Sequence, residues 1–196
     1  MASRSAIVFL LGLALAAAGC DRQRPGDGQA TAAHNATSPD EVQPTRKNHS
    51  ARNAVDHHQR GLAPVDAFFI SPDGQRTRIA DFRGKPVLLN LWATWCAPCV
   101  KELPTLDALA GQLGDKVTVL AVSQDMEPAK VAPFVAARHL TRLKPYTDPE
   151  MGLSLGYRIN LPTTILFDAK GHEVWRTSGE MDWTSAAARK LVDEAI

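Results

Sequence analysis

Two apolar runs with an amphipathic segment between them occupy the middle of this chain. Residues 86–93 are apolar except for Asn90, which is typical of a strand buried on both faces of a sheet. Farther on, apolar side chains recur every three or four positions, the period of a helix with one face on a core: Val100, Leu103, Leu106, Leu109 and Leu113. Residues 116–122 form the second, largely apolar run. The pattern therefore predicts a strand, a helix and a strand in succession.

The flanking segments add further elements to this unit. A Ser-Pro-Asp-Gly turn sequence separates residues 66–70 from residues 77–79, so these two stretches predict a β-hairpin. Toward the C-terminus the patterns predict, in order, a helix over 127–140, a strand over 163–168, a strand over 173–176 and a helix from Thr184. The order predicts an α/β fold, with a central mixed β-sheet flanked by helices and the hairpin as an N-terminal extension. We expect one domain over residues 62–196.

The first residues have the composition of a secretory signal. Arg4 is the single positive charge ahead of the apolar run at residues 6–15, which is too short for a stable transmembrane helix. We interpret residues 1–19 as a signal peptide of the lipoprotein type, because Cys20 follows in a sequence that resembles a bacterial lipobox. Cys20 would then be lipidated. The alternative is cleavage after Ala18, which leaves a soluble periplasmic protein with a spare thiol.

Residues 20–61 have almost no large apolar side chains and are rich in small, polar and charged ones. Such a segment cannot bury enough surface to offset ordering, so it predicts a flexible tether. Four of the six histidines lie here: His34, His49, His57 and His58. Their spacing shows no repeat, so we favour a solvated linker over a metal-collecting one.

Cys96 and Cys99 open the predicted central helix. Backbone N–H groups at a helix N-terminus favour an anion, so we expect the thiolate of Cys96 to be stabilised. A zinc site needs about four ligands, whereas the only other cysteine lies at the far end of the chain. A structural disulfide closing so short a loop restricts the unfolded chain little. We therefore interpret the pair as a redox-active disulfide, with no metal bound.

The segment Asn90–Pro104, which reads NLWATWCAPCVKELP, resembles the active-site segment of the thioredoxin superfamily. More narrowly, it is similar to the membrane-anchored TlpA, ResA and CcmG-like thiol-disulfide oxidoreductases. Thioredoxin carries a buried Asp at the position of Asn90, whereas this branch typically carries Asn there and Glu at the position of Glu102. The resemblance covers residues 63–196 and implies a thioredoxin-like fold.

The resemblance also implies the parts of a site. Pro162 would be a cis proline facing the two cysteines, with the backbone of Leu161 pairing with a substrate segment and Thr163 beside it. Trp95 would form the rim on which partners dock, and the alternative is a purely packing role. Glu102 would handle the proton of Cys99, since the two residues are three positions apart on one helix face. The alternative for Glu102 is an exposed helix residue favoured by the dipole.

These features predict an extracytoplasmic protein disulfide reductase. Its partners would be disulfide-containing extracytoplasmic proteins, in cytochrome c maturation or oxidase assembly, and a membrane electron donor would re-reduce it. We expect a monomer without organic cofactor, held by its lipid anchor on the periplasmic face of the bacterial inner membrane. The alternatives are a thiol oxidase and a copper-binding chaperone that uses the same cysteines. A formal net charge of +1 and the lack of a basic block argue against nucleic acid as a ligand.

Overall fold

A single mixed sheet organises the part of the chain that the computed structural model describes, residues 54–196. Within these residues the sheet has eight strands. In sheet order they are β1 (Val55–Asp56), β8 (Glu173–Ser178), β7 (Thr163–Phe167), β4 (Val87–Trp92), β5 (Thr118–Ser123), β6 (Tyr146–Thr147), β2 (Phe69–Ile70) and β3 (Arg76–Thr77). β4 lies in the middle, parallel to β5 and antiparallel to β7.

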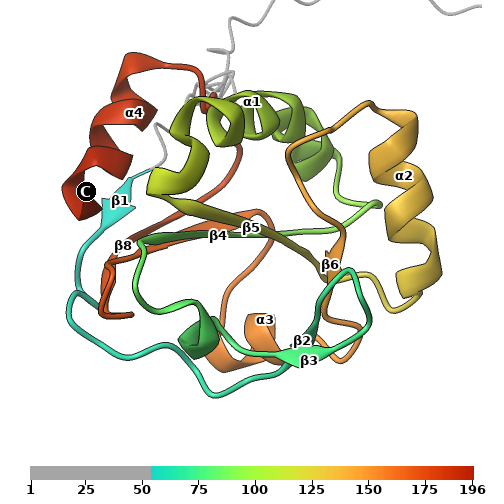
Figure 1. Cartoon of the computed structure of the whole chain (residues 1–196), viewed down its shortest axis with the longest axis horizontal. Coiled ribbons are helices and arrows are strands. Elements are labelled where there is room, and N and C mark those ends of the chain that lie inside the picture. Colours follow the sequence, from blue (N-terminus) through green and yellow to red (C-terminus); the bar gives the residue numbers. More distant parts are fainter. Residues whose placement is uncertain (1–53) are drawn as a thin grey trace, which may run out of the picture. The chain divides into compact units, whose positions relative to one another are not determined.

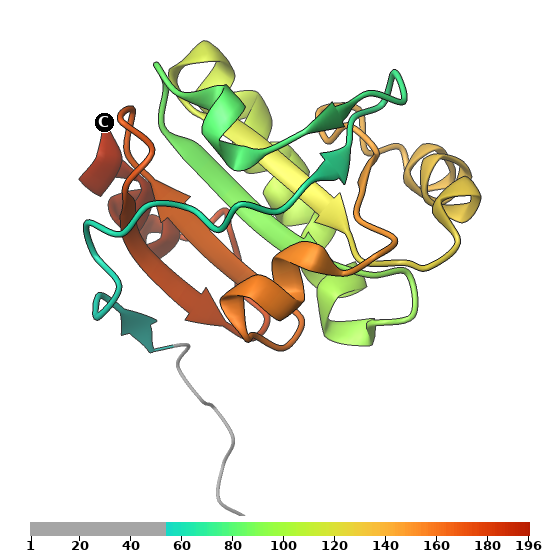
Figure 2. The same ribbon diagram turned by 90° about the horizontal axis from the view of Figure 1, so that it is seen from below.

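Helices cover both faces of this sheet (Figure 1). They are α1 (Ala97–Leu113), α2 (Val131–Ala137), α3 (Gly152–Tyr157) and α4 (Ala186–Val192). α1 and α4 lie on one face, and α3 lies on the other. The connection from β1 to β2 runs across the same face as α3 (Figure 2). The fold is therefore the α/β arrangement that the sequence predicts.

β4 is buried along its whole length because both of its faces meet apolar layers. Successive side chains of a strand point to opposite faces. Accordingly, Leu88 and Trp92 join the core under α1, whereas Leu89 and Leu91 join the core on the α3 side. Asn90 is the polar exception and is fully buried on the α1 side of the strand, where it contacts Glu102.

α1 begins at the cysteine pair because Cys96 is its N-cap residue, with extended backbone, and Pro98 lies in the first turn. The helix runs through Pro104 without interruption and ends at Leu113, where Gly114 caps it with a φ of 53°. Its buried stripe holds Cys99, Glu102, Leu103, Leu106, Leu109 and Leu113. This stripe fixes the rotation of the helix, and with it the direction of Cys99 and Glu102 into the protein.

Several elements are shorter than the pattern predicts. β2 and β3 pair antiparallel around the Ser-Pro-Asp-Gly turn with two partner pairs. The helix expected over 127–140 is divided into a 3-10 turn, Pro128–Lys130, and α2. The chain then leaves the helical conformation before Leu140, because His139 has a φ of 55°.

The folded region begins earlier than the expected boundary at Leu62. Val55 and Asp56 pair with Thr177 and Arg176 of β8 as an edge strand, so residues 55–61 belong to the domain and not to the tether. The expected signal peptide, Cys20 and most of the expected tether lie outside the described residues. No helix within residues 54–196 is long and apolar enough to cross a membrane.

Candidate active site

Cys96 and Cys99 form a disulfide at the start of α1, with their Cα atoms 5.3 Å apart. A tight turn after β4 brings them there, since the N–H of Cys96 donates to the carbonyl of Ala93 at 3.2 Å. Cys96 keeps 7% of its surface exposed, whereas Cys99 has none. Only Cys96 can therefore meet a partner sulfur from outside without a change in the fold.

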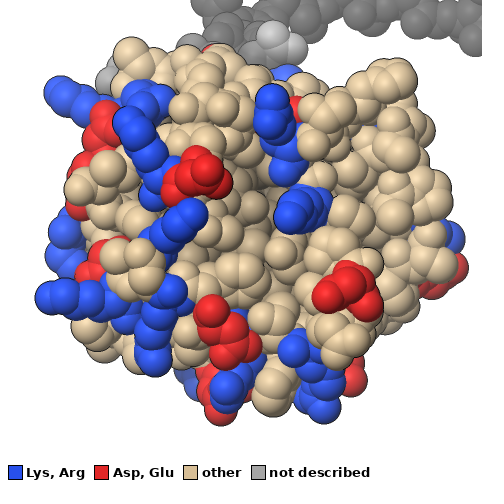
Figure 3. Space-filling view, in the orientation of Figure 1, with Lys and Arg blue, Asp and Glu red and all other residues tan. Residues whose placement is uncertain are grey.

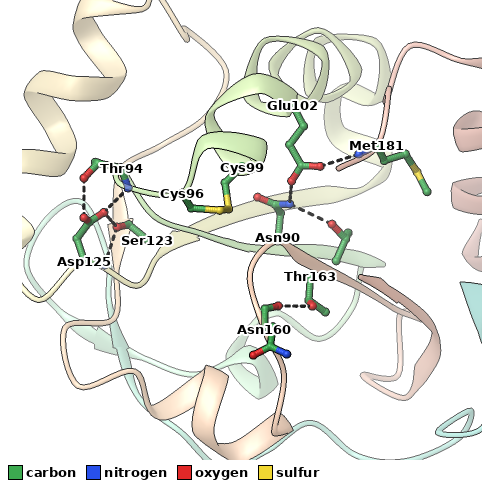
Figure 4. Close-up of a disulfide and its surroundings, with 11 residues drawn as sticks. Asn90, Thr94, Cys96, Cys99, Glu102, Ser123, Asp125, Asn160, Thr163 and Met181 are labelled. Atoms are coloured by element: carbon green, nitrogen blue, oxygen red, sulfur yellow. Dashed lines mark hydrogen bonds between the residues drawn. A yellow bond between two sulfur atoms is a disulfide. The ribbon is translucent and has the colours of Figure 1, made fainter. Parts of the chain in front are cut away.

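An acidic side chain that the sequence analysis does not single out holds this turn. Asp125 follows β5 and accepts hydrogen bonds from the N–H of Thr94 at 2.9 Å, from its hydroxyl at 2.6 Å, and from the hydroxyl of Ser123 at 2.5 Å (Figure 4). Asp125 is buried. Since Thr94 precedes Trp95 and Cys96, this clamp sets where the reactive end of α1 begins.

Glu102 lies one helical turn beyond Cys99 and is 2% exposed. Both carboxylate oxygens accept hydrogen bonds: Oε1 from Nδ2 of Asn90 at 2.7 Å, and Oε2 from the N–H of Met181 at 3.0 Å. Nδ2 of Asn90 also donates to the hydroxyl of Thr164 at 3.0 Å. Three segments distant in sequence thus meet at this carboxyl (Figure 4).

Burial raises the pKa of Glu102 from 4.5 to about 7. The cause is desolvation, which penalises the charged form, and the negative charge of Glu180 adds to it. The hydrogen bonds from Asn90 and from the backbone of Met181 act in the opposite direction, as does the side chain of Trp183. The geometry therefore excludes the alternative of an exposed helix residue and gives the site a carboxyl that titrates near neutral pH.

The segment before β7 forms the other side of the site. The Leu161–Pro162 peptide bond is cis, and Leu161 lines a groove together with Trp95 and Cys96. The groove has a volume of about 430 Å³ and is lined otherwise by Gln124, Met151, Ser154, Leu155, Ile159 and Asn160. Trp95 and Leu155 are each 68% exposed. The sequence gives no signal for the contribution of α3 to this groove.

Thr163 lies behind the surface of the groove. Its side chain is fully buried, and its hydroxyl donates to the carbonyl of Asn160 at 2.6 Å and lies 3.0 Å from the hydroxyl of Ser178. Thr163 therefore supports the loop that carries Leu161 and Pro162, and its side chain offers no contact to a docking protein.

One face of the domain carries charged side chains of both signs. On the face seen in Figure 3, Lys and Arg side chains lie next to Asp and Glu, and the area toward α2 is largely uncharged. Within residues 54–196, no three His, Cys, Asp or Glu side chains lie close enough together to hold a metal ion.

Comparison with known proteins places this geometry in a family. Residues 59–194 match the Redoxin family. The chain belongs to the Redoxin family. The chain is 34% identical to "Thioredoxin-like protein YneN" of Bacillus subtilis (strain 168) over 117 residues, which is 58% of this chain and 68% of that protein. It is 36% identical to "Thiol:disulfide interchange protein DsbE" of Pseudomonas fluorescens biotype C over 128 residues, 59% of this chain and 67% of the relative.

A solved structure agrees with this placement. The pneumococcal exposed lipoprotein thioredoxin Etrx1 of Streptococcus pneumoniae strain TIGR4 superposes with a TM-score of 0.58 at 28% identity, over 66% of this chain and 99% of that one. The protein is thus a thiol-disulfide oxidoreductase of the Redoxin family with a thioredoxin-like fold and a Cys96–Cys99 pair.

Proposed function

We propose that this protein is an extracytoplasmic disulfide reductase that acts through Cys96 and Cys99. The observation that carries the proposal is the difference in exposure between the two cysteines. Cys96 is the partly exposed N-cap residue of α1, and Cys99 is buried toward Asn90 and Glu102. A dithiol with one accessible and one protected sulfur suits attack by the first and resolution by the second.

In the reaction, the Cys96 thiolate attacks one sulfur of a partner disulfide, and the other partner sulfur leaves as a thiolate. A mixed disulfide between Cys96 and the partner results. Cys99 then loses its proton and attacks the Cys96 sulfur, which releases the partner as a dithiol and leaves the Cys96–Cys99 disulfide. Two electrons have passed to the partner, and a membrane electron donor must return them.

The remaining site residues take supporting roles in this proposal. Glu102 accepts the proton of Cys99, for which a pKa of about 7 is well matched. Trp95 and the backbone of Leu161 receive the partner chain in the groove, and the cis peptide bond to Pro162 sets the direction of that backbone. We assign the partners to extracytoplasmic proteins, because the N-terminal sequence resembles a lipoprotein signal and one structural neighbour is called an exposed lipoprotein. The resemblance to the ResA and CcmG-like branch extends the proposal to cytochrome c maturation or oxidase assembly.

Trapping tests the proposal directly. Replacing Cys99 by Ser should leave one attack intact and accumulate mixed disulfides on Cys96, whereas replacing Cys96 by Ser should abolish both reduction and trapping. Mass spectrometry of the trapped species from cells identifies the partner. If Cys99 is the thiol that alkylates faster in the reduced protein at neutral pH, the two roles are reversed.

A further inference from the structure

Asn90 lies between the disulfide and Glu102, and its amide is only half satisfied. Its Nδ2 donates to Glu102 Oε1 at 2.7 Å and to Thr164 Oγ1 at 3.0 Å, which uses both amide hydrogens. Its Oδ1 is buried and has no hydrogen-bond partner among the described residues. Figure 4 shows this oxygen on the side of the disulfide and the nitrogen turned toward Glu102. A buried oxygen without a donor, next to reacting sulfurs, needs a physical reason.

The hydrogen-bond partners of Glu102 supply that reason. Both of its oxygens accept hydrogen bonds, from Asn90 and from the N–H of Met181. A neutral Glu102 must instead donate through its O–H. The N–H of Met181 cannot accept, whereas Asn90 can accept after its amide rotates by half a turn. In the rotated amide, Oδ1 accepts from both Glu102 and the Thr164 hydroxyl, and Nδ2 faces the sulfur of Cys99.

We propose that Asn90 is a positioning residue whose amide rotates with the proton of Glu102 and thereby sets the protonation of Cys99. This inference rests on the roles proposed above for Cys99 and Glu102. When Glu102 is ionised, Oδ1 of Asn90 accepts from the Cys99 thiol. When Glu102 is protonated, Nδ2 donates to the Cys99 thiolate. One proton leaves Cys99 Sγ and one is bound at Glu102 Oε1, so the buried site keeps the same net charge.

Constant charge matters because each uncompensated charge in a buried site is costly. The negative charge of Glu180 raises the pKa of Glu102. Glu180 also forms an ion pair with Lys101 at 2.5 Å. Because burial brings the pKa of Glu102 to about 7, both arrangements are accessible near neutral pH. An ionised aspartate at position 90 could only accept, and it would add a second negative charge to the buried site.

Glu102→Gln provides the decisive variant, because glutamine mimics the neutral acid. The Oε1 atom of this glutamine can keep the hydrogen bond from Met181 only if its Nε2 atom donates to Asn90. Asn90 can accept that bond only in its rotated orientation. In the oxidised full-length variant at pH 8, nuclear Overhauser contacts of the Asn90 Nδ2 protons should therefore reach the β protons of Cys99. In the oxidised wild type at pH 8 they should reach Thr164. Identical contacts in the two proteins would overturn the proposal.

A control separates rotation from simple charge removal. Glu180→Gln removes a nearby carboxylate without touching Asn90 and should leave the contacts of the Asn90 amide as in the wild type. If Glu180→Gln rotates the amide as well, the rotation does not depend on the Glu102 proton and the inference fails.

The titration of Cys99, followed by its ¹³Cβ shift in the reduced protein, gives a second measurement. Glu102→Gln should lower the Cys99 midpoint by about one pH unit, about tenfold in thiolate at a given pH. Most of that shift should vanish when Glu102→Gln is added to Asn90→Leu and compared with Asn90→Leu alone. An undiminished shift in the double variant means that Glu102 acts without Asn90. Reduction of insulin disulfides by the wild type tests the proposed function separately.

Discussion

At the scale of single residues, Glu102 links proton binding to folding. Its pKa is about 7 in the folded protein against 4.5 for the free group, because burial disfavours the charged form. The folded state therefore binds this proton more tightly than the unfolded chain. Its contribution to stability is fully present below pH 4.5 and is lost as the pH rises through about 7.

Glu102→Gln should remove this pH dependence from the free energy of unfolding. Between pH 4.5 and pH 8 the oxidised wild type should lose roughly 3 kcal/mol relative to the variant, since each pKa unit corresponds to about 1.4 kcal/mol. Urea unfolding of both proteins across this range measures the difference. Parallel stability curves would show that Glu102 does not titrate in the folded protein.

At the scale of elements, the clamp between β5 and the start of α1 controls the position of Cys96. Asp125→Ala leaves the N–H and hydroxyl of Thr94 without their acceptor, so it should cost about 2 kcal/mol and slow disulfide exchange. Asp107→Ala is the matched control, because Asp107 also accepts two backbone hydrogen bonds, from Arg142 and Leu143. It should cost comparable stability and leave the exchange rate unchanged.

An equal loss of exchange rate in Asp125→Ala and Asp107→Ala would contradict the clamp as a positioning device. In that case the lower rate would follow from general destabilisation, and both proteins should recover activity together on cooling.

The elements predicted correctly from the sequence are those that local pattern determines. β4 and α1 follow from an apolar run and from a helical period that begins at a proline-containing turn. α3 was missed because it has only six residues. Its start is held by the turn just before it, where Asp148 accepts from the N–H groups of Gly152 and Leu153 at 3.0 and 2.9 Å. β6 was missed because its two residues become a strand only through their pairing with β5 and β2.

The candidate site likewise has residues that could be predicted from the sequence and residues that could not. The cysteines stand out in the sequence because they open the predicted central helix, and Pro162 was identified through the family resemblance. The hydrogen bond from Met181 to Glu102 joins residues 79 positions apart, so the pattern of apolar and polar positions along the chain does not predict it. The role of Asp125 could not be predicted from the sequence either, since a single acidic residue after a strand resembles any loop residue.

At the scale of the whole molecule, the direction of electron flow is the property to measure. Ala97 and Pro98 place no charged side chain between the cysteines, so the thiolate lacks the stabilisation that a strong oxidant needs. We expect a reduction potential nearer to about −270 mV, the value for thioredoxin, than to about −120 mV, the value for DsbA. Equilibration with glutathione measures it, and a potential above roughly −160 mV would identify a thiol oxidase instead.

The proposed lipid anchor at Cys20 is tested by where the protein is found in the cell. Cys20→Ala should move the protein from the membrane fraction to the soluble fraction of the cell envelope, because a lipidated residue 20 would hold the chain at the membrane. The purified variant should reduce disulfides at the wild-type rate. Unchanged fractionation would show that Cys20 carries no anchor.

The exposure of Trp95 gives the protein a built-in optical probe. Trp92, Trp175 and Trp183 are each at most 1% exposed, whereas Trp95 is 68% exposed beside Cys96. Emission from an indole shifts to shorter wavelength when the ring leaves water, so a partner that covers the groove should change the emission of Trp95 alone. Comparing the wild type with Trp95→Phe isolates that signal, and the time course of docking can then be followed without an attached label.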